Sequence, residues 1–360
     1  MSSLRIDAPS GQSRVDVGLP LAQTEMWGRT PTIYDVARVA GVAPSTVSRA
    51  LSRPDRVRYQ TAEHVRRAAA ELGYRKGHLD RMLSERGTRV LVFVVADIAN
   101  PVYFGMIRGA ERAASDRGLT VLVLDSQESE PAERSTLERL IPLVDGLVLS
   151  SSWLSDAAVR SLAKRKPVIL LNRTVSEVSS LVIDSVHAIK KAAEHLTGLG
   201  HSSICYLAGP EASWADGMRW RGLRTAGLEL DLHARRLGPF QPTMPGGAAA
   251  AQQWLRRPTT AVIAYNDLMA IGFVQKVTAA GLDVPGDVSV IGFDNIVDGI
   301  LLEPHLTTIA APLVSLGSAA VARLVKNSQR ERAGAEKPVL LPARLVVRGS
   351  TGPCQASRAV

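Results

Sequence analysis

Short, uninterrupted apolar runs alternate with segments of helical period over most of this chain, and that alternation limits its fold more than any other feature. Runs that are apolar throughout indicate strands buried on both faces, as in parallel sheets covered by helices. The runs fall into two series, which predicts two α/β lobes in tandem. The first series covers 90–96, 121–124, 146–150, 167–172 and 180–184, with helices between them such as 102–117 and 155–164, and the second covers 203–209, 260–265 and 288–293.

The segment from Thr32 to Ser52, TIYDVARVAGVAPSTVSRALS, has a different pattern. Its apolar residues recur at three- and four-residue spacing on both sides of Gly41, which predicts two short helices joined by a tight turn. Thr32 can cap the first helix, Asp35 favours its positive end, and Pro44 suits the first turn of the second. The outward face of the second helix carries Ser, Thr and Arg, which can contact phosphates and base edges in a major groove. From the pattern alone, a solvated helical hairpin is equally compatible.

This segment resembles the DNA-binding headpiece of the LacI/GalR family of bacterial transcription regulators. The resemblance is carried by Thr-Ile-Tyr-Asp-Val-Ala, Ala-Gly-Val and Ser-Thr-Val-Ser-Arg-Ala-Leu, and it is nearly continuous from Thr32 to Leu51. It implies an all-α helix-turn-helix domain at 30–74 that binds operator DNA. The DNA-binding candidates in that domain are Thr32, Tyr34, Pro44, Ser45, Thr46, Ser48, Arg49, Ser52, Arg56 and Tyr74.

Two departures from the family pattern affect the reading of bases. Ala43 stands where the family usually has a capping Ser, and Pro44 stands where relatives often carry a base-reading side chain. Ser45 and Arg49 are therefore the expected base readers. A third helix, expected at 61–72, would pack on the first two.

Residues 75–88 correspond to the family's hinge, which forms a helix when two chains meet on operator DNA and inserts a leucine into the minor groove. Leu83 takes the matching position. Lys76-Gly77 and Asp80 depart from the family pattern, because glycine lowers helix propensity by about 1 kcal/mol and an acid near phosphates is repelled. A plain flexible linker is the alternative for this segment.

Basic residues are concentrated in this N-terminal region. Between Thr30 and Gly87 there are 11 Arg and Lys against 6 Asp and Glu, a net +5 of the chain's formal +9. Such a concentration is expected of a protein that binds a polyanion. Residues 1–29 are polar and aperiodic, so a disordered arm is expected there, and Met26 is a candidate for the true translation start.

The cysteines and the apolar runs bear on compartment and chemistry. The two cysteines, Cys205 and Cys354, make neither a disulfide framework nor a metal set, which favours a reducing cytoplasm. Because no run approaches 18 apolar residues and no secretory pattern is present, we expect no membrane partner and no exported binding protein. No cofactor, metal or enzymatic activity is expected. His187, His195 and His201 lack a nucleophile motif and are interpreted as surface or helix-end residues.

For the core at 89–350, the resemblance implies two parallel-sheet, Rossmann-like lobes similar to those of periplasmic sugar-binding proteins, with three crossings of the chain between them. It assigns about 89–184 and 312–330 to the first lobe, and about 185–311 and 335–350 to the second. Residues 351–360 form a tail without apolar heptads, so a homodimer is expected rather than a coiled-coil tetramer.

Polar and aromatic side chains follow the predicted strands, at the strand ends where open parallel sheets bind ligands. Planar donors and acceptors mixed with rings suit a carbohydrate, and a purine could use the same mixture. Three segments, GPEASWADGMRWRG, YNDLMAIG and VSVIGFDN, resemble the family's effector-binding motifs. For the Asp and Asn residues, simple helix capping is the alternative. The effector-binding candidates are Asp97, Tyr103, Phe104, Ser150, Asn172, Ser213, Trp214, Arg219, Phe240, Asn266 and Asp294.

The expected function is that of a sequence-specific transcription regulator, most often a repressor in this family. It would bind a pseudo-palindromic operator as a homodimer, under the control of a small-molecule effector. A sugar or sugar derivative is the favoured effector, and a nucleoside is the second choice. The alternative is a cytoplasmic small-molecule sensor without direct control of genes.

Overall fold

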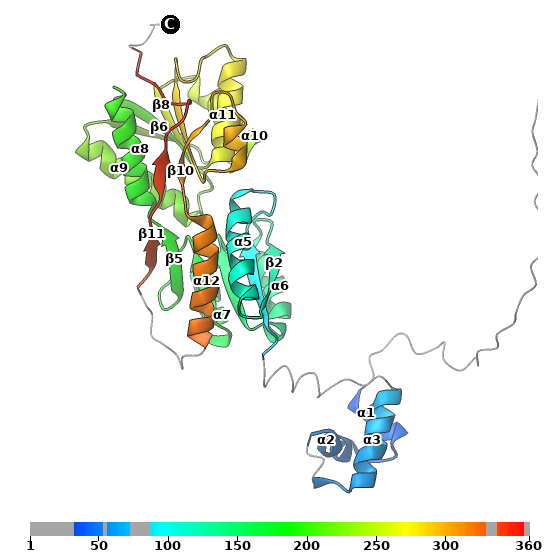
Figure 1. Cartoon of the computed structure of the whole chain (residues 1–360). Coiled ribbons are helices and arrows are strands. Elements are labelled where there is room, and N and C mark those ends of the chain that lie inside the picture. The colour runs from blue at the N-terminus through cyan, green and yellow to red at the C-terminus, as the bar shows by residue number, and fades with distance from the viewer. Residues whose placement is uncertain (1–31, 53–55, 73–86, 329–336, 356–360) are drawn as a thin grey trace, which may run out of the picture. The chain divides into compact units, whose positions relative to one another are not determined.

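The computed structural model describes residues 32–52, 56–72, 87–328 and 337–355, and the chain divides into two compact units, 1–86 and 87–360 (Figure 1). Each unit is described by itself. The N-terminal arm with Met26, and the segment that contains Tyr74, Lys76-Gly77, Asp80 and Leu83, lie outside the described residues.

The N-terminal unit is a small helical domain built around Val36, Val47 and Val65, which are all buried. At the start of its first helix, the Asp35 carboxylate accepts hydrogen bonds from the hydroxyl and the backbone N–H of Thr32, at 2.7 and 2.8 Å, and these bonds lower the pKa of Asp35. Gly41 makes the turn with a φ of +61°, a conformation that favours glycine. The helices are α1 (Ile33–Val39), α2 (Pro44–Ser52) and α3 (Tyr59–Glu71).

The second unit contains two lobes, each built on a six-stranded sheet. The first sheet has the order β11-β5-β4-β3-β1-β2 and is parallel throughout. Its strands are β1 (Val90–Val95), β2 (Thr120–Asp125), β3 (Gly146–Ser150), β4 (Val168–Leu171), β5 (Ser179–Ile183) and β11 (Val339–Leu341). The helices of this lobe are α5 (Val102–Ser115), α6 (Glu130–Leu140), η2 (Ile141–Leu143), α7 (Asp156–Arg165) and α12 (Leu313–Ser328).

The second sheet has the matching order β12-β10-β9-β8-β6-β7, and only its β10–β12 pair is antiparallel. Its strands are β6 (Ser203–Leu207), β7 (His233–Leu237), β8 (Ala261–Ala264), β9 (Ser289–Phe293), β10 (Thr307–Ala310) and β12 (Arg344–Val346). The helices of this lobe are α8 (Ser185–Gly198), α9 (Trp214–Glu229), α10 (Met244–Trp254), α11 (Asp267–Ala279) and η3 (Val297–Ile300). The predicted fold class, a helical headpiece with a two-lobed α/β core, is confirmed.

The chain passes between the lobes three times, after β5, after β10 and after β11. One boundary differs from the expectation, because 335–350 does not belong wholly to the second lobe. Residues 339–341 pair with β5 in the first sheet, and the chain crosses only at Pro342. An apolar Val-Leu-Leu run can complete the edge of the first sheet, and the proline that follows cannot extend that strand.

Within each lobe, two helices approach so closely that only glycine fits at their crossing. In the first lobe a Cβ on Gly317 would overlap the main-chain oxygen of Met106, and one on Gly109 would overlap that of Val314. Figure 1 shows α5 and α12 side by side. The same close approach recurs in the second lobe, where a Cβ on Gly247 of α10 would overlap the main-chain oxygen of Met269 in α11, and one on Gly272 of α11 would overlap that of Met244 in α10. The crossing fixes the position of α5 against the first sheet.

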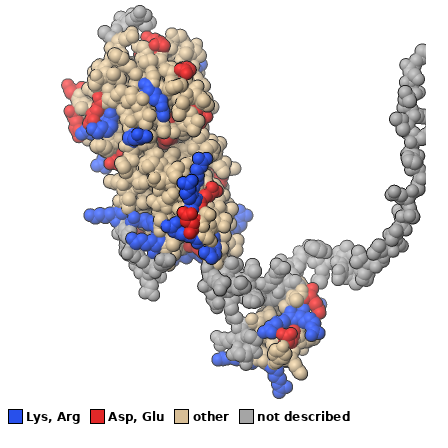
Figure 2. Space-filling view, in the orientation of Figure 1, with Lys and Arg blue, Asp and Glu red and all other residues tan. Residues whose placement is uncertain are grey.

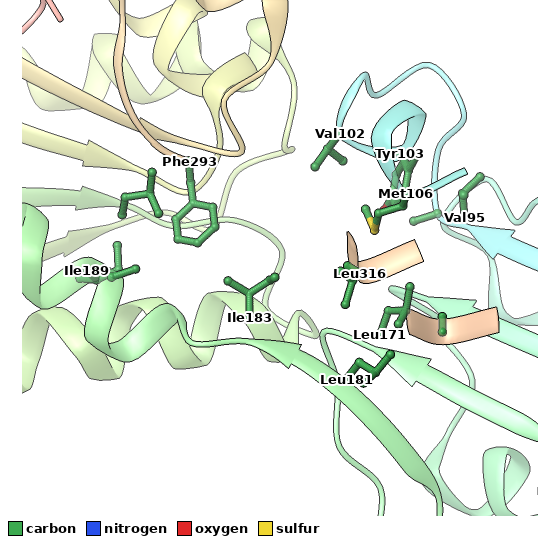
Figure 3. Close-up of a cluster of buried hydrophobic side chains, with 14 of the residues drawn as sticks. Val95, Val102, Tyr103, Met106, Leu171, Leu181, Ile183, Ile189, Phe293 and Leu316 are labelled. Carbon is green, nitrogen blue, oxygen red and sulfur yellow. The ribbon is translucent and has the colours of Figure 1, made fainter. Parts of the chain in front are cut away.

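One apolar cluster continues from the first lobe into the second (Figure 3). Ile183, at the end of β5, is drawn between Phe293 of the second lobe and Leu171 of the first. Met106 of α5 belongs to the same cluster. The two lobes therefore share one hydrophobic core at their junction, and side chains there pack against it.

Candidate functional site

A cavity of about 580 Å³ lies where the carboxyl ends of the two sheets meet. Loops after β1, β2, β3 and β4 line it from the first lobe, and loops after β6, β7, β8 and β9 line it from the second. Small-molecule sites in proteins typically enclose about 300–1,000 Å³. The cavity is therefore large enough for a ligand of one or two rings.

Strained backbone is concentrated around this cavity. Glu128, Ser151, Asn172 and Asp294 are non-glycine residues with φ of +55°, +58°, +53° and +112°, and all four line it. Each follows a different strand. Such conformations cost about 1–3 kcal/mol each and occur preferentially at functional sites.

Most of the predicted effector residues line the cavity, and three do not. Helical geometry separates the neighbours Tyr103 and Phe104, so Tyr103 faces the cavity and Phe104 is 53% exposed on the outside of α5. Ser150 is buried at the end of β3 with its hydroxyl 3.8 Å from the sulfur of Met106, and Phe240 packs against the core of the second lobe. The predicted residues that line the cavity are Asp97, Tyr103, Asn172, Ser213, Trp214, Arg219, Asn266 and Asp294.

Arg219 and Asp294 form the buried polar centre of the second-lobe wall. The Arg219 guanidinium lies over the rings of Phe293 and Tyr265, at 3.7 and 4.6 Å from their centroids, and donates to the Tyr265 carbonyl. Its Nη2 is 3.7 Å from Asp294 Oδ1, which is an ion pair without a hydrogen bond. Arg219 Nε has no hydrogen-bond partner, and within the described parts of the chain no group donates to the Asp294 carboxylate. Both groups therefore keep bonding capacity.

Helix capping accounts for part of what the other predicted residues do. Asn266 caps α11 by accepting from the Met269 N–H at 3.0 Å, and Ser213 caps α9 by accepting from the Asp216 N–H at 3.2 Å. The Asn172 Oδ1 accepts from the Ile183 N–H at 3.2 Å. These side chains line the cavity and also hold the loops that form it.

Several lining residues were absent from the predicted set, among them Glu128, Met106, Glu211 and Tyr265. Glu128 follows a predicted strand, so the strand-end rule could have included it. Met106 sits one helical turn after Tyr103 on α5, and only the orientation of that helix brings it to the wall.

Raising the pH from about 6 to about 9 is expected to lower the free energy of unfolding by about 1–3 kcal/mol. Burial raises the pKa of Asp267 to about 8 and that of Asp294 to about 7, from an ordinary value of 3.8. The folded protein therefore keeps protons that the unfolded chain has released. The stability that comes from these retained protons is fully present below pH 3.8. It is lost as the pH rises through the folded-state pKa values of about 7 and about 8. Denaturant titrations across that range measure it, and Asp294→Asn should flatten the profile; a profile already flat in the unmodified protein would contradict it.

A buried carboxylate of α6, that of Glu133, holds the loop after β3 in place. Glu133 accepts from the Ser152 hydroxyl at 2.6 Å and from the Trp153 N–H at 3.0 Å. Burial raises the pKa of Glu133, and these two bonds oppose the rise. From the other side, Arg173 donates to the carbonyls of Ser152 and Leu154, at 2.9 and 2.7 Å. Trp153 is therefore presented to the cavity by a loop fixed at both edges.

Glu133→Ala is expected to lower the free energy of unfolding by about 1–3 kcal/mol, because it leaves buried donors unpaired. Chemical denaturation measures the change. Glu138→Ala on the same helix is the control, since its ion pair with Arg165 is exposed on both sides and should be worth less than about 1 kcal/mol. Equal effects of the two substitutions would show that Glu133 has no special part in holding the loop.

His201 corrects the interpretation of the histidines as surface or helix-end residues. It is 2% exposed, and its ring nitrogens lie 2.9 Å from the Thr260 hydroxyl, 3.0 Å from the Ser289 hydroxyl and 3.1 Å from the Gly352 carbonyl. The C-terminal segment folds over the histidine and buries it. Burial lowers the pKa of His201. Among the described residues, no cluster of metal-ligating side chains is found.

The N-terminal unit presents its predicted DNA-binding side chains on the surface. Tyr34 is 70% exposed, and Ser45, Ser48, Arg49 and Arg56 are exposed too. Thr32, Pro44 and Thr46 are half-buried, and Ser52 is the last residue of α2. Blue Lys and Arg side chains lie on the face of this unit shown in Figure 2. Tyr59, which was not among the predicted residues, is 77% exposed.

Comparison with known sequences identifies both parts of the chain. Residues 32–76 match the family described as "Bacterial regulatory proteins, lacI family", and residues 193–351 match the "Periplasmic binding protein-like domain". The HTH-type transcriptional repressor CytR of Escherichia coli K12 is 34% identical over 330 residues, which cover 89% of this chain and 96% of CytR. The chain belongs to the LacI family. GalR of the same organism, another member of that family, is 32% identical over 80% of this chain and 87% of its own length.

Solved structures of LacI-family proteins have the same architecture. The lac repressor dimer bound to operator and the anti-inducer ONPF matches with a TM-score of 0.68 and 27% identity, covering 90% of this chain and 100% of that one. The regulator CelR in complex with cellobiose matches with a TM-score of 0.67 and 29% identity, covering 89% and 99%. This LacI-family protein is a DNA-binding transcription regulator. No helix within its described residues is long and apolar enough to cross a membrane.

Proposed function

We propose that this protein is a repressor that binds a pseudo-palindromic operator as a homodimer and changes its operator affinity when an effector occupies the cavity. The observation that carries the proposal is the Arg219–Asp294 pair, a donor and an acceptor that are buried, adjacent and incompletely bonded at a cavity wall. A ligand with neighbouring hydroxyls can satisfy both groups at once. The similarity to a lac repressor dimer on operator supports the dimer and the DNA target.

A sugar or sugar derivative is the favoured effector, with a nucleoside as the second choice. The wall offers carboxylates, amides and hydroxyls, and it includes Trp153, Trp214 and Tyr103, whose rings can contact the C–H face of a sugar or stack on a base. A LacI-family regulator from Enterococcus faecium, solved with bound ribose, is 29% identical and matches with a TM-score of 0.66 over 74% of this chain and 100% of that one. The complex of CelR with cellobiose is a second sugar-bound structure whose sequence is similar to that of this chain.

Control of DNA binding requires a coupling free energy between the cavity and the headpiece, typically about 1–3 kcal/mol. Because both lobes contribute to the cavity, a ligand that contacts both can bias their relative arrangement. The segment 75–88, with Leu83 as the residue that enters the minor groove, would carry this bias to the DNA.

Arg49→Ala is expected to weaken operator binding by about 1–3 kcal/mol and to relax selectivity at one base pair per half-site. The exposed guanidinium of Arg49 is held by a 3.2 Å bond from its Nε to the Ser45 carbonyl, which leaves the remaining N–H groups for a base. Binding titrations against operator variants measure both effects. Arg66→Ala on α3, where Arg66 is exposed and pairs with Glu63, is the matched control and should leave the base preference unchanged. If Arg49→Ala kept the base preference of the unmodified protein, Arg49 would not be a base-reading residue.

The experiment that tests the proposal combines thermal melting with DNA binding. Sugars, sugar phosphates and nucleosides are first screened for compounds that raise the melting temperature, since a ligand of the folded state stabilises it by about RT ln(1+[L]/Kd). Each hit is then added to the protein on DNA from upstream of its own gene. A changed affinity supports the proposal. Failure to bind any DNA specifically would favour a sensor without direct control of genes.

A further inference from the structure

The first-lobe wall of the cavity contains two neighbouring carboxylates. Asp97 follows β1 and Glu128 follows β2, and these strands pair in parallel with Val95 opposite Asp125, so their loops leave the sheet side by side. Gln127 and Glu128 both have left-handed backbone, with φ of +49° and +55°. The chain thus places Glu128 at the wall in spite of unfavourable backbone geometry.

Within the described part of the chain, no positive charge compensates the Asp97–Glu128 pair. Asp97 Oδ1 accepts from the Ala99 N–H at 2.9 Å, and neither carboxylate makes an ion pair with a Lys or Arg of the described residues. Burial, and then the charge of Asp97, raises the pKa of Glu128. A third carboxylate of the cavity, Glu211 on the second lobe, also has no basic partner within the described chain. The cavity therefore has an excess of negative charge.

The two arginines that line the cavity each lie beside a carboxylate of the chain, so neither adds an uncompensated positive charge. Arg173 donates to two carbonyls of the loop after β3 and pairs with Asp156 at 2.5 Å. Arg219 donates to the Tyr265 carbonyl, lies over the rings of Tyr265 and Phe293 and faces Asp294. The charge of each guanidinium is therefore balanced by a neighbouring carboxylate, and among the described residues no lysine or histidine lines the cavity.

A separate observation indicates that the cavity holds a ligand. The Arg219 side chain is 8% exposed, lines the cavity and has a buried Nε without a hydrogen-bond partner. Unpaired buried donors are costly, at about 1–3 kcal/mol each, and a ligand acceptor would relieve that cost. At this end the ligand must accept a hydrogen bond, whereas at the Asp97–Glu128 end it must donate.

We propose that the effector is an unphosphorylated, uncharged or amine-bearing polyhydroxyl compound whose O–H or N–H donors face Asp97 and Glu128, and that phosphorylated and carboxylated compounds are rejected. The inference rests on the proposed function and narrows its ligand class. Hydroxyl and ammonium groups donate to carboxylates, whereas a phosphate near Asp97 and Glu128 would add like charge to a site without a free cation. Phosphorylated sugars, which the proposed function alone would allow, are thereby excluded.

The first test needs no ligand. Glu128→Gln in the full-length protein is expected to raise the melting temperature by about 1–2 °C at low ionic strength, and by less in high salt, because it removes one of two unpaired like charges. Glu177→Gln is the matched control: Glu177 is an exposed residue of the same lobe with φ of +69°, outside the lining of the cavity, and its substitution should change nothing. An unchanged melting temperature for Glu128→Gln would overturn the proposal.

The second test uses calorimetric titration with sugars that differ in charge only, namely D-ribose against its 5-phosphate, and D-glucose against its 6-phosphate and against D-glucosamine. In any set that binds, the unphosphorylated members should bind about 10-fold or more tightly than the phosphate, and Glu128→Gln should narrow the gap. A phosphate that binds as tightly as its parent sugar would overturn the proposal. If none of these sugars binds, the melting temperatures of Glu128→Gln and Glu177→Gln decide whether the proposal stands.

Failure of this inference and failure of the proposed function give different results. A sugar that occupies the cavity without changing operator affinity would contradict the proposed function and leave the ligand class intact. A phosphorylated compound that changes operator affinity through the cavity would leave the proposed function intact and contradict the ligand class.

Discussion

Gly317→Ala is expected to destabilise the protein by about 3 kcal/mol or more, at the upper end of what overpacking causes. The added methyl group would overlap the main-chain oxygen of Met106 and come within 3.0 Å of the Ala110 nitrogen. Because both neighbours are backbone, no rotamer change can relieve the overlap, and α5 and α12 must separate. Thermal and urea unfolding followed by circular dichroism measure the loss.

Gly217→Ala is the matched control for that substitution. Gly217 also lies within a helix, α9, but a Cβ there meets nothing within 4 Å. Its replacement should raise the free energy of unfolding by about 0.4–1 kcal/mol, because alanine restricts the unfolded chain and favours the helix. If both glycine substitutions shifted stability in the same direction, close approach of α5 and α12 could not be the reason for Gly317.

Arg219→Ala is expected to weaken effector binding by about 100-fold or more, equivalent to about 2.7 kcal/mol or more, while operator binding persists. The substitution removes the donor at the centre of the cavity wall and leaves the buried Asp294 carboxylate without the one cation that faces it among the described residues. Calorimetric titration of the compound found by melting gives the affinity, and DNA binding with and without that compound gives the response.

Two further variants separate the role of Arg219 in binding from its role in stability. Arg221→Ala changes an exposed arginine two residues further along α9 and should leave effector affinity unaltered. Combining Arg219→Ala with Asp294→Asn removes the uncompensated charge and should restore part of the melting temperature without restoring binding. A normal effector response in Arg219→Ala would place the effector elsewhere.

Local sequence was sufficient to predict the strands whose two faces are both covered. β1, β3, β4, β8 and β9 are runs of apolar residues with buried side chains, and each was predicted to within a residue or two. β7 was missed because it lies at a sheet edge, where its sequence His-Ala-Arg-Arg-Leu has polar side chains at exposed and half-exposed positions. The strand periodicity of a short edge segment is too weak to separate it from a loop.

The cavity was predictable to the extent that it follows from sheet geometry. Side chains directly after a parallel strand must gather at one sheet edge, which is how Asp97, Asn172 and Asp294 were found. Orientation beyond the strand end depends on tertiary structure. Nothing local distinguishes Tyr103 from Phe104 on α5, and Phe240 is drawn into the second-lobe core by residues distant in sequence.

The threefold passage of the chain between the lobes has a consequence for synthesis on the ribosome. Both sheets receive their sixth strand late, as β11 and β12, and the first lobe must also wait for its helix α12, which is translated only after β10 of the second lobe. A nascent chain thus emerges with its first lobe incomplete and the edge of β5 uncovered until β11 has been translated. A frameshift or premature stop between β10 and β11 would therefore leave unfinished the lobe that was made first.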